Sequence, residues 1–249
     1  MMRLLTNLIL IAGFWAHPTA ATEVTTKLYR DAVKHQGRPN ADRALDASRQ
    51  PRAILGFVQL QQGMIVIELG AGGGYTTELV SHTVGQTGRI YAQALEPSRL
   101  AGERLSNVVA LEPHPLYQLT DKLAAAGFVA GSADAVLIFF ALHDMYLNTR
   151  IDKQRLYRDI HRSLKPGGVL VVLDNASEPD SGTRDTRQLH RIGEQFVIEE
   201  IQRQGFILDE SSDVLRNPDD DLKKSWNAWR PAVPRGFQDR FALRFRKPL

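Results

Sequence analysis

The segment that most restricts the fold of this chain is IVIELGAGGGYTTELV, residues 65–80, in which four glycines occupy five positions after an apolar run. The four apolar residues Ile65, Val66, Ile67 and Leu69 before the glycines suit a strand that is covered on both faces, as in a parallel sheet. Glycine lets the backbone turn sharply and lets a ligand come close to it. The segment therefore predicts a strand, a ligand-binding turn and a helix in succession.

Short apolar runs alternate with amphipathic segments along the rest of the chain, which indicates βαβ units and a doubly wound parallel sheet. The predicted strands are Ile65–Leu69, Ile90–Ala94, Val108–Leu111, Ala135–Phe140, Val169–Leu173, Phe206–Leu208 and Arg240–Lys247, and the predicted helices are Thr76–His82, Ser98–Leu105, Ile151–Leu164 and Thr186–Gln204. Arginines alternate with apolar residues in the last strand, so we expect its basic face to be solvated. The acidic run Asp219–Asp221 is expected to begin another helix, residues 222–229.

The first 21 residues have the layout of a secretory signal peptide. Arg3 precedes an apolar stretch, Leu4–Ala16, and small residues follow at Ala20 and Ala21. The stretch is shorter than the roughly 18 to 20 residues that cross a bilayer, which favours cleavage after Ala20 or Ala21 over stable membrane insertion. We therefore expect a periplasmic or secreted protein, with a helical lead-in over residues 22–63 and one α/β domain over residues 64–249.

Composition excludes several other classes of protein and site. The chain of 249 residues has no cysteine, so it forms no disulfide. Its net charge is +3 and its lysines and arginines are scattered, which gives no indication of nucleic-acid binding. The seven histidines show no metal-ligand spacing, so no metal site is expected. The oligomeric state is not indicated.

Three kinds of ligand commonly bind at a glycine-rich turn of this type: a triphosphate, a dinucleotide or S-adenosylmethionine. A triphosphate loop needs Lys after the last glycine, and here Tyr75 follows Gly74. A dinucleotide fold needs a small residue at the position of Tyr75, where helix and strand pack closely. Glu68 would face a pyrophosphate unfavourably but would suit an ammonium group. The loop thus favours S-adenosylmethionine, with a dinucleotide-dependent oxidoreductase as the alternative enzyme.

The motif Glu68-Leu69-Gly70-Ala71-Gly72-Gly73-Gly74 resembles the first motif of the class I S-adenosylmethionine-dependent methyltransferases. The runs LKPGGVLVVLD, residues 164–174, and GSADAVLIFFALHDM, residues 131–145, resemble the fifth and fourth strands of that family. The resemblance implies a Rossmann-like sheet of seven strands with the last antiparallel, and S-adenosylmethionine as cofactor. It assigns cofactor binding to Glu68, Gly70, Ala71, Gly72, Gly74 and Tyr75.

The chain is most similar within this family to a group of predicted bacterial methyltransferases, some of which have export signals. The shared motifs are His143-Asp144, Leu189-His190-Arg191-Ile192 and Arg216-Asn217-Pro218. This resemblance makes Arg184, His190, Arg191 and Asn217 candidates for binding a small-molecule acceptor, although a solvated helix face explains Arg184, His190 and Arg191 as well.

One position departs from the family pattern. Ala94 stands where an Asp or Glu usually binds the ribose hydroxyls, and Glu96, two residues on, is the nearest replacement. Glu112 stands where the family often contacts adenine. The missing acid at Ala94 leaves open a binding module of the same fold that has lost methyl transfer.

His143 is the candidate general base. It follows the predicted fourth strand, at the edge where open α/β sheets bind ligands, and Asp144 is expected to orient it. The alternative is a histidine that packs there while Asp144 begins a helix. A base is needed only if the acceptor loses a proton, and the sequence does not identify the acceptor.

Overall fold

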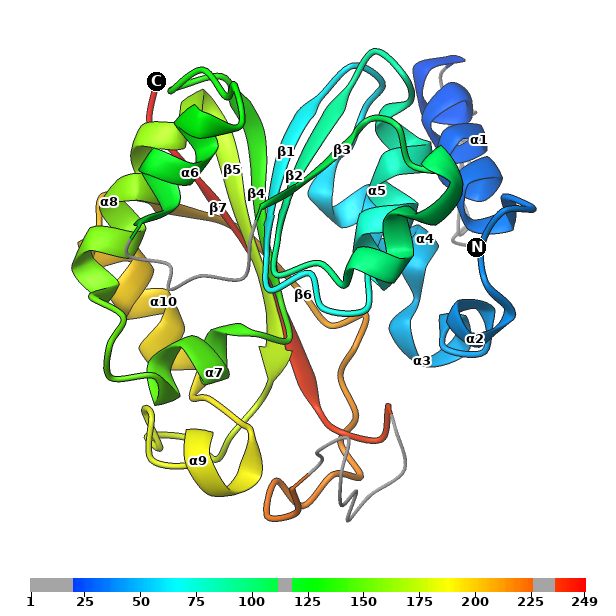
Figure 1. The fold of residues 1–249 in the computed structure, drawn as a ribbon. Helices are drawn as coiled ribbons and strands as arrows, with labels where there is room; N and C mark the ends of the chain where they lie inside the picture. Colours follow the sequence, from blue (N-terminus) through cyan, green and yellow to red (C-terminus); the bar gives the residue numbers. More distant parts are fainter. Residues whose placement is uncertain (1–19, 112–117, 226–235) are drawn as a thin grey trace, which may run out of the picture.

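The computed structural model describes residues 20–111, 118–225 and 236–249. A seven-stranded sheet with the order β3-β2-β1-β4-β5-β7-β6 forms its centre (Figure 1). The strands are β1 (Ile65–Leu69), β2 (Arg89–Gln93), β3 (Val108–Leu111), β4 (Ala133–Phe139), β5 (Leu164–Asn175), β6 (Ile207–Ser212) and β7 (Arg240–Arg246). Strands β1 to β5 pair in parallel, and β7 runs antiparallel to both β5 and β6. The predicted Rossmann-like sheet with its last strand antiparallel is confirmed.

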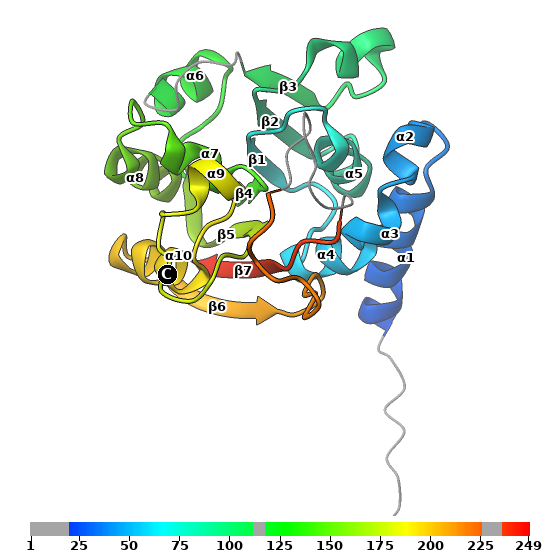
Figure 2. The same cartoon turned by 90° about the horizontal axis from the view of Figure 1, so that it is seen from below.

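Helices cover both faces of the sheet. Helices α6, α8 and α10 lie on one face and α1, α4 and α5 on the other, as Figure 2 shows along the edge of the sheet. The helices are α1 (Ala20–Lys34), α2 (Asn40–Arg43), α3 (Asp46–Arg49), α4 (Pro51–Val58), α5 (Tyr75–Val84), the 3₁₀ helix η1 (Pro97–Glu103), α6 (Leu119–Ala125), α7 (Leu142–Leu147), α8 (Lys153–Ser163), α9 (Thr186–Leu189) and α10 (Glu194–Arg203). Helices α2 to α4, and α1 apart from its first two residues, lie in the predicted helical lead-in.

The central strands are buried on both sides, which explains why their sequences are apolar without alternation. In β1, Val66 and Ile67 are both inaccessible to solvent, although they point to opposite faces. Ile67 belongs to the core under α8 and α10, and Val66 to the core under α4 and α5. The continuous apolar runs therefore report a sheet between two helical layers.

The order in which strands are added to the sheet changes direction between β1 and β4. From β1 the chain proceeds outward through β2 to β3, and it then returns to β4 on the other side of β1. The carboxyl ends of β1 and β4 consequently flank the kind of crevice where open α/β sheets bind their ligands.

The prediction of a solvated basic face on the last strand is wrong. Strand β7 lies between β5 and β6, and Arg240 and Arg244 are buried. Arg244 donates to the Phe57 carbonyl and to the carboxylates of Asp209 and Glu210. Arginine can occupy this face because helices α3 and α4 cover it with carbonyl acceptors and β6 adds carboxylates.

The single helix predicted over Thr186–Gln204 is also wrong, because the chain breaks between α9 and α10. His190 adopts a left-handed conformation with φ of 52°, and Ile192 forms an isolated parallel bridge with Ala176, just after β5. The Ile192 N–H donates to the Asn175 carbonyl, and the Ile192 carbonyl accepts from the Ser177 N–H. Pairing with the extension of β5 satisfies the backbone here in place of helical hydrogen bonds.

No helix begins at the acidic run Asp219–Asp221. Residues 218–225 are turns and irregular backbone, and the remainder of the predicted helix lies outside the described residues. The predicted signal peptide falls mostly on residues 1–19, which also lie outside them, and the proposed cleavage point coincides with the start of α1. Within the described ranges, no helix has the length and apolar character required to cross a membrane.

Candidate active site

The glycine loop joins β1 to α5 with three glycines in left-handed conformations. Gly70 and Gly72 have φ of 77° and 51°. A Cβ on Gly70 would come within 2.5 Å of the Ala141 Cβ, so the loop packs tightly against the end of β4. Among the described residues, a Cβ on Gly72 would meet no atom closer than 4.0 Å, so these residues leave this side of the loop open. A ligand can therefore approach the backbone at Gly72, which is what the sequence predicts.

Glu68 lies at the carboxyl end of β1, beneath this loop. Glu68 is 3% exposed, and its side chain accepts a hydrogen bond of 2.6 Å from the Thr77 hydroxyl. Burial raises the pKa of Glu68 to about 7, against the Thr77 hydrogen bond and the nearby positive charge of Arg49, which lower it. A carboxyl group in this state becomes a stronger partner when a cation approaches, because a nearby positive charge favours the ionised form. The role of Glu68 beside the cofactor's ammonium group stays a prediction.

The end of β2 closes the other side of the loop. Ala94 has a φ of 60°, and its carbonyl accepts from the Gly72 N–H at 3.1 Å. The Gln93 side chain, which sequence reasoning missed, accepts from the Gly70 N–H at 3.0 Å and so fixes the loop. Glu96 is exposed, and its Oε1 lies 4.0 Å from where a Cβ on Gly73 would stand. The structure thus places Glu96 beside the glycine loop, and its contact with ribose stays a prediction; Glu112 lies outside the described residues.

Tyr75 begins α5 and is held by the N-terminal helices. Its hydroxyl donates to Asp46 at 2.8 Å, and the Arg49 guanidinium carbon lies 4.5 Å from its ring centroid. Asp46 in turn forms an ion pair of 2.6 Å with Arg38. The hydroxyl of Tyr75 is therefore engaged within the protein, so any cofactor contact of this residue must use its backbone or its ring.

His143 lies in the first turn of α7, just past the carboxyl end of β4, and is 4% exposed. Its Nδ1 is 2.7 Å from Oδ1 of Asp174, which is completely buried near the end of β5. The Asp174 carboxylate also accepts from the His143 N–H at 2.9 Å. Asp174, not Asp144, therefore orients the imidazole, and the prediction for Asp144 is wrong on this point. The signal was present in the sequence, because Asp174 ends the apolar run of β5.

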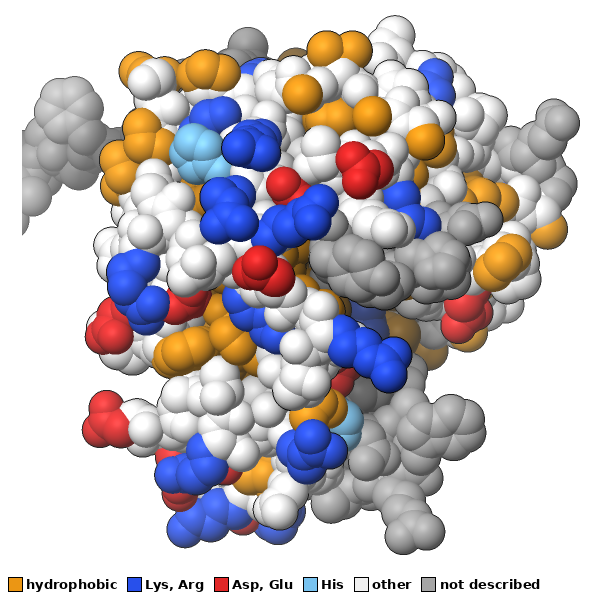
Figure 3. Space-filling model, turned by 60° about the vertical axis from the view of Figure 1, so that its left-hand side comes forward, with side chains coloured by type: hydrophobic (Ala, Val, Ile, Leu, Met, Phe, Trp, Pro, Cys, Tyr) orange, Lys and Arg blue, Asp and Glu red, His pale blue; other side chains and the backbone are white. Residues whose placement is uncertain are grey.

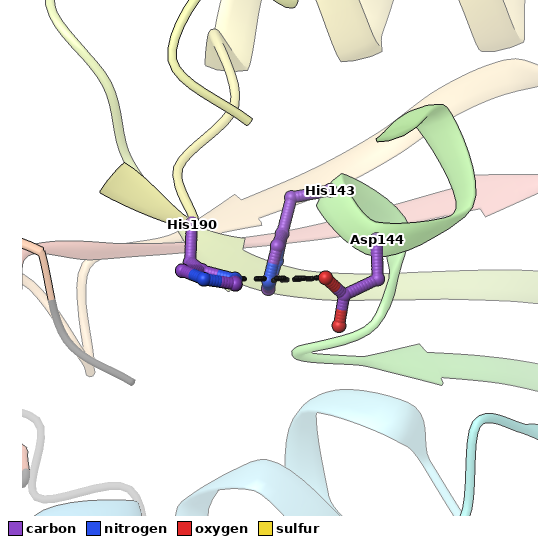
Figure 4. Close-up of side chains that lie close together, drawn as sticks. All are labelled: His143, Asp144 and His190. Carbon is purple, nitrogen blue, oxygen red and sulfur yellow. Dashed lines mark ion pairs between the residues drawn. The ribbon is translucent and has the colours of Figure 1, made fainter. Parts of the chain in front are cut away.

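Asp144 lies on the other side of the same ring. Its Oδ1 is 3.5 Å from Nε2 of His143 and 3.6 Å from Nδ1 of His190, as Figure 4 shows. The two imidazole rings are nearly perpendicular, with centroids 5.4 Å apart. Burial favours the neutral form of His143, but the carboxylates of Asp174 and then Asp144 outweigh it and leave the pKa of His143 above its usual value. Three groups of metal-ligand type thus meet here, which the spacing of histidines in the sequence did not indicate.

The other predicted acceptor-binding residues lie in structural networks. Arg191 is completely buried and pairs with Asp220 at 2.8 Å, so it is neither solvated nor available to a substrate. The Asn217 side chain donates to the Phe237 carbonyl. Arg184 is an exposed residue that pairs with Asp185 and Glu178. Of the four candidates, only His190 lies in the cluster with His143.

The face drawn in Figure 3 shows no large basic area of the kind that binds nucleic acid. Basic and acidic side chains are interspersed there, and no area of one sign covers the face. Electrostatic binding of nucleic acid relies on clustered basic residues.

Residues 67–172 match the family model of a methyltransferase domain, and residues 23–107 match that of protein-L-isoaspartate(D-aspartate) O-methyltransferase. The chain is 28% identical over 174 residues to the ubiquinone/menaquinone biosynthesis C-methyltransferase UbiE of Enterobacter sp. (strain 638). The aligned residues make up 67% of this chain and 65% of that protein. It is 29% identical over 143 residues to UbiE of Klebsiella pneumoniae (strain 342), which covers 54% of each. The chain thus spans about half to two thirds of the length of these curated relatives.

Solved structures share the fold at low identity. A SAM-dependent methyltransferase from Aquifex aeolicus has a TM-score of 0.54 at 18% identity, with 85% of this chain and 99% of that chain covered. Phosphoethanolamine N-methyltransferase 2 of Haemonchus contortus, in complex with S-adenosyl-L-methionine, has a TM-score of 0.55 at 16% identity, with 89% and 60% covered. The glycine loop, the buried acid at the end of β1 and these matches agree: residues 67–172 form a domain that matches the methyltransferase model, and the chain has the fold of S-adenosylmethionine-dependent methyltransferases.

Proposed function

We propose that the protein transfers the methyl group of S-adenosylmethionine to a small-molecule acceptor that binds beyond the carboxyl ends of β4 and β5. The observation that carries this proposal is the position of His143. It stands just past β4, held by Asp174 from β5, at the same edge of the sheet as the open glycine loop at Gly72. The glycine loop and a polar, oriented side chain therefore lie at the same edge of the sheet.

Methyl transfer from a sulfonium is an in-line displacement, so the chain must mainly hold the acceptor atom in line with the methyl carbon. Alignment of the reacting atoms at about 3 Å can supply several kcal/mol of the reduction in barrier. Where the acceptor must lose a proton, His143 is placed to assist, since Asp174 holds Nδ1 and leaves Nε2 directed toward Asp144 and His190.

The relatives suggest which acceptor atom to test first. Both UbiE proteins named above are C-methyltransferases of ubiquinone and menaquinone biosynthesis. Carbon is therefore the first acceptor atom to test for this chain, followed by oxygen. The fold does not choose between them, because different chemistries share one scaffold.

A labelled-methyl assay tests the proposed function. The protein is incubated with S-adenosylmethionine that carries a CD₃ group and with a small-molecule cell extract, and products are found by mass spectrometry. We expect a product 17 mass units above its precursor, since CD₃ replaces hydrogen, and none with Gly72→Val. No labelled product in any extract, from protein that binds the cofactor, would contradict methyl transfer.

We also propose that the protein is exported. The support is the sequence of residues 1–21, with one basic residue, an apolar stretch and small residues before Thr22. Export would require that the cofactor, or protein already loaded with it, reaches the outer compartment. The mature N-terminus tests this proposal independently of the enzymatic one.

A further inference from the structure

We propose that His143, Asp144 and His190 bind one divalent transition-metal ion, and that this ion binds an ionisable oxygen of the methyl acceptor. The first part depends only on the geometry of the described residues. The second part rests on the proposed function, because it assigns the ion a place in methyl transfer.

The separations between the three groups fit ligands of one ion better than they fit hydrogen bonds. Asp144 Oδ1 lies 3.5 Å from His143 Nε2 and 3.6 Å from His190 Nδ1, and the three ligand atoms all lie within 4.8 Å of one another. Both measured distances exceed a normal N–H···O hydrogen bond, about 2.7 to 3.2 Å. Two ligands about 2.1 Å from a tetrahedral ion lie roughly 3.4 Å apart. Small side-chain adjustments would therefore complete the site.

His143 has the surroundings of a metal-bound histidine. Asp174 is completely buried and engages Nδ1 at 2.7 Å, so in the neutral ring the proton resides on Nδ1 and the lone pair of Nε2 faces the cluster. A carboxylate that accepts from the second nitrogen is the usual partner of a metal-bound imidazole, since it fixes the tautomer and the ring orientation. The His143 side chain is 5% exposed, which rules out simple solvation as the reason for this arrangement.

The backbone of His190 supports the same inference. This residue is left-handed with a φ of 52°, a conformation that costs a non-glycine residue about 1 to 2 kcal/mol. The Asn175 side chain donates to its carbonyl at 3.1 Å, and the break between α9 and α10 places its ring at right angles to His143. Strained residues of this kind gather at functional sites. Figure 4 shows the three side chains converging from α7 and from the end of α9.

The donor set indicates the class of ion and its chemistry. Two imidazoles and one carboxylate suit Zn²⁺ and neighbouring divalent metals, and three protein ligands leave positions open for a further oxygen. An acceptor hydroxyl, phenol or enol bound there releases its proton to solvent water, since the ion stabilises the anion. The anion then forms a bond to the methyl carbon, at its oxygen or at a conjugated carbon that afterwards loses its own proton to water. The carbon–sulfur bond breaks, and its electron pair stays on sulfur in S-adenosylhomocysteine.

This assignment replaces the direct-base role of His143, because Nε2 cannot both bind the ion and accept a proton. The two readings give different results. A base needs no metal, whereas a metal ligand makes turnover depend on the ion.

The experiment uses the full chain without a histidine tag, stripped with a chelator and then titrated with Zn²⁺ by calorimetry. We expect one Zn²⁺ per chain. Asp144→Asn, at a half-exposed position, and His190→Asn, which tolerates the left-handed backbone, should each weaken Zn²⁺ binding more than about 100-fold, beyond the effect of losing an outer partner. His35→Ala removes an exposed histidine outside the cluster and should leave binding unchanged.

The outcomes separate this inference from the proposed function. Tight binding of one Zn²⁺ that survives both cluster substitutions, or no saturable binding of Zn²⁺ by the wild type after the same treatment, would overturn the site. Folding is checked in parallel by titration with S-adenosylhomocysteine, which should bind all variants alike. A third outcome is that Zn²⁺ binds at the cluster while labelled-methyl transfer is equal with and without the ion. That result would support the metal site and contradict its role in methyl transfer.

Discussion

Glu68 gives a prediction that joins burial, charge and cofactor binding. The Glu68→Gln substitution keeps the size of the side chain and an acceptor for the Thr77 hydroxyl, but it removes the ionisable group. Because the wild-type carboxyl has a pKa raised to about 7, it is partly protonated at neutral pH in the free protein. The cationic amino group of the cofactor should favour the ionised form of Glu68, so the carboxyl group should lose its proton when the cofactor binds.

The magnitude follows from the pKa difference. The pKa is about 7 in the fold and 4.5 for the unperturbed group, so the difference is 7 − 4.5 = 2.5 units, or roughly 3 kcal/mol at about 1.36 kcal/mol per unit. The folded pKa is the higher one, so this contribution to stability is fully present below about pH 4.5 and is lost as pH rises through about 7. Glu68→Gln should lack this loss, and its free energy of unfolding at pH 8 should exceed that of the wild type by up to about 3 kcal/mol.

Cofactor binding should show the opposite trend. We expect the affinity of the wild type for S-adenosylhomocysteine to rise from pH 6 to pH 8, as Glu68 becomes ionised. Glu68→Gln should bind about 1 to 3 kcal/mol more weakly at pH 8, with little dependence on pH. Thr77→Val should move the rise to higher pH, since the Thr77 hydroxyl stabilises the carboxylate.

Calorimetric titration of the three proteins from pH 6 to pH 8.5 and urea unfolding over the same range are the measurements. Identical affinities and identical pH profiles for wild type and Glu68→Gln would refute the role of the carboxylate at the cofactor.

Three further predictions concern other parts of the molecule. Asp220→Asn should lower the free energy of unfolding by about 3 kcal/mol, because it leaves the buried Arg191 guanidinium without its carboxylate. The control Asp221→Asn, at an exposed neighbouring position, should change this free energy little. Urea denaturation measures both. Asp174→Asn should weaken Zn²⁺ binding about 10- to 100-fold, measured by calorimetry, and unchanged affinity would contradict its positioning role. N-terminal sequencing of native protein should begin near Ala21 or Thr22, and an intact Met1 would count against export.

The sheet was predictable because its signal is local. Runs such as Val136–Ile138 and Val169–Leu173 are apolar throughout, as is typical of short strands covered on both faces. The glycine loop was likewise predictable, since its backbone conformation depends on residues that are adjacent in sequence.

The errors arose where distant segments meet. The alternation in β7 indicated a solvated basic face, but α3 and α4, from the other end of the chain, cover Arg240 and Arg244. The periodicity of residues 186–204 indicated one helix, but pairing with the end of β5 interrupts it at His190. No local pattern contains these contacts.

The candidate site was predictable only in part for the same reason. His143 and His190 were identified as separate motifs, but their approach to one carboxylate depends on α7 and the end of α9 lying together. Asp174 is 31 residues from His143, so its role became visible only when β4 and β5 were paired.

Titration with S-adenosylhomocysteine at matched glycine substitutions shows whether the open side of the glycine loop binds S-adenosylmethionine. Gly72 and Gly127 both have positive φ and room for a Cβ, but only Gly72 lies in the loop. We predict saturable binding by the wild type and by Gly127→Val, and none by a folded Gly72→Val. No heat from the wild type, or equal binding by all three proteins, would show that the loop is not the cofactor site.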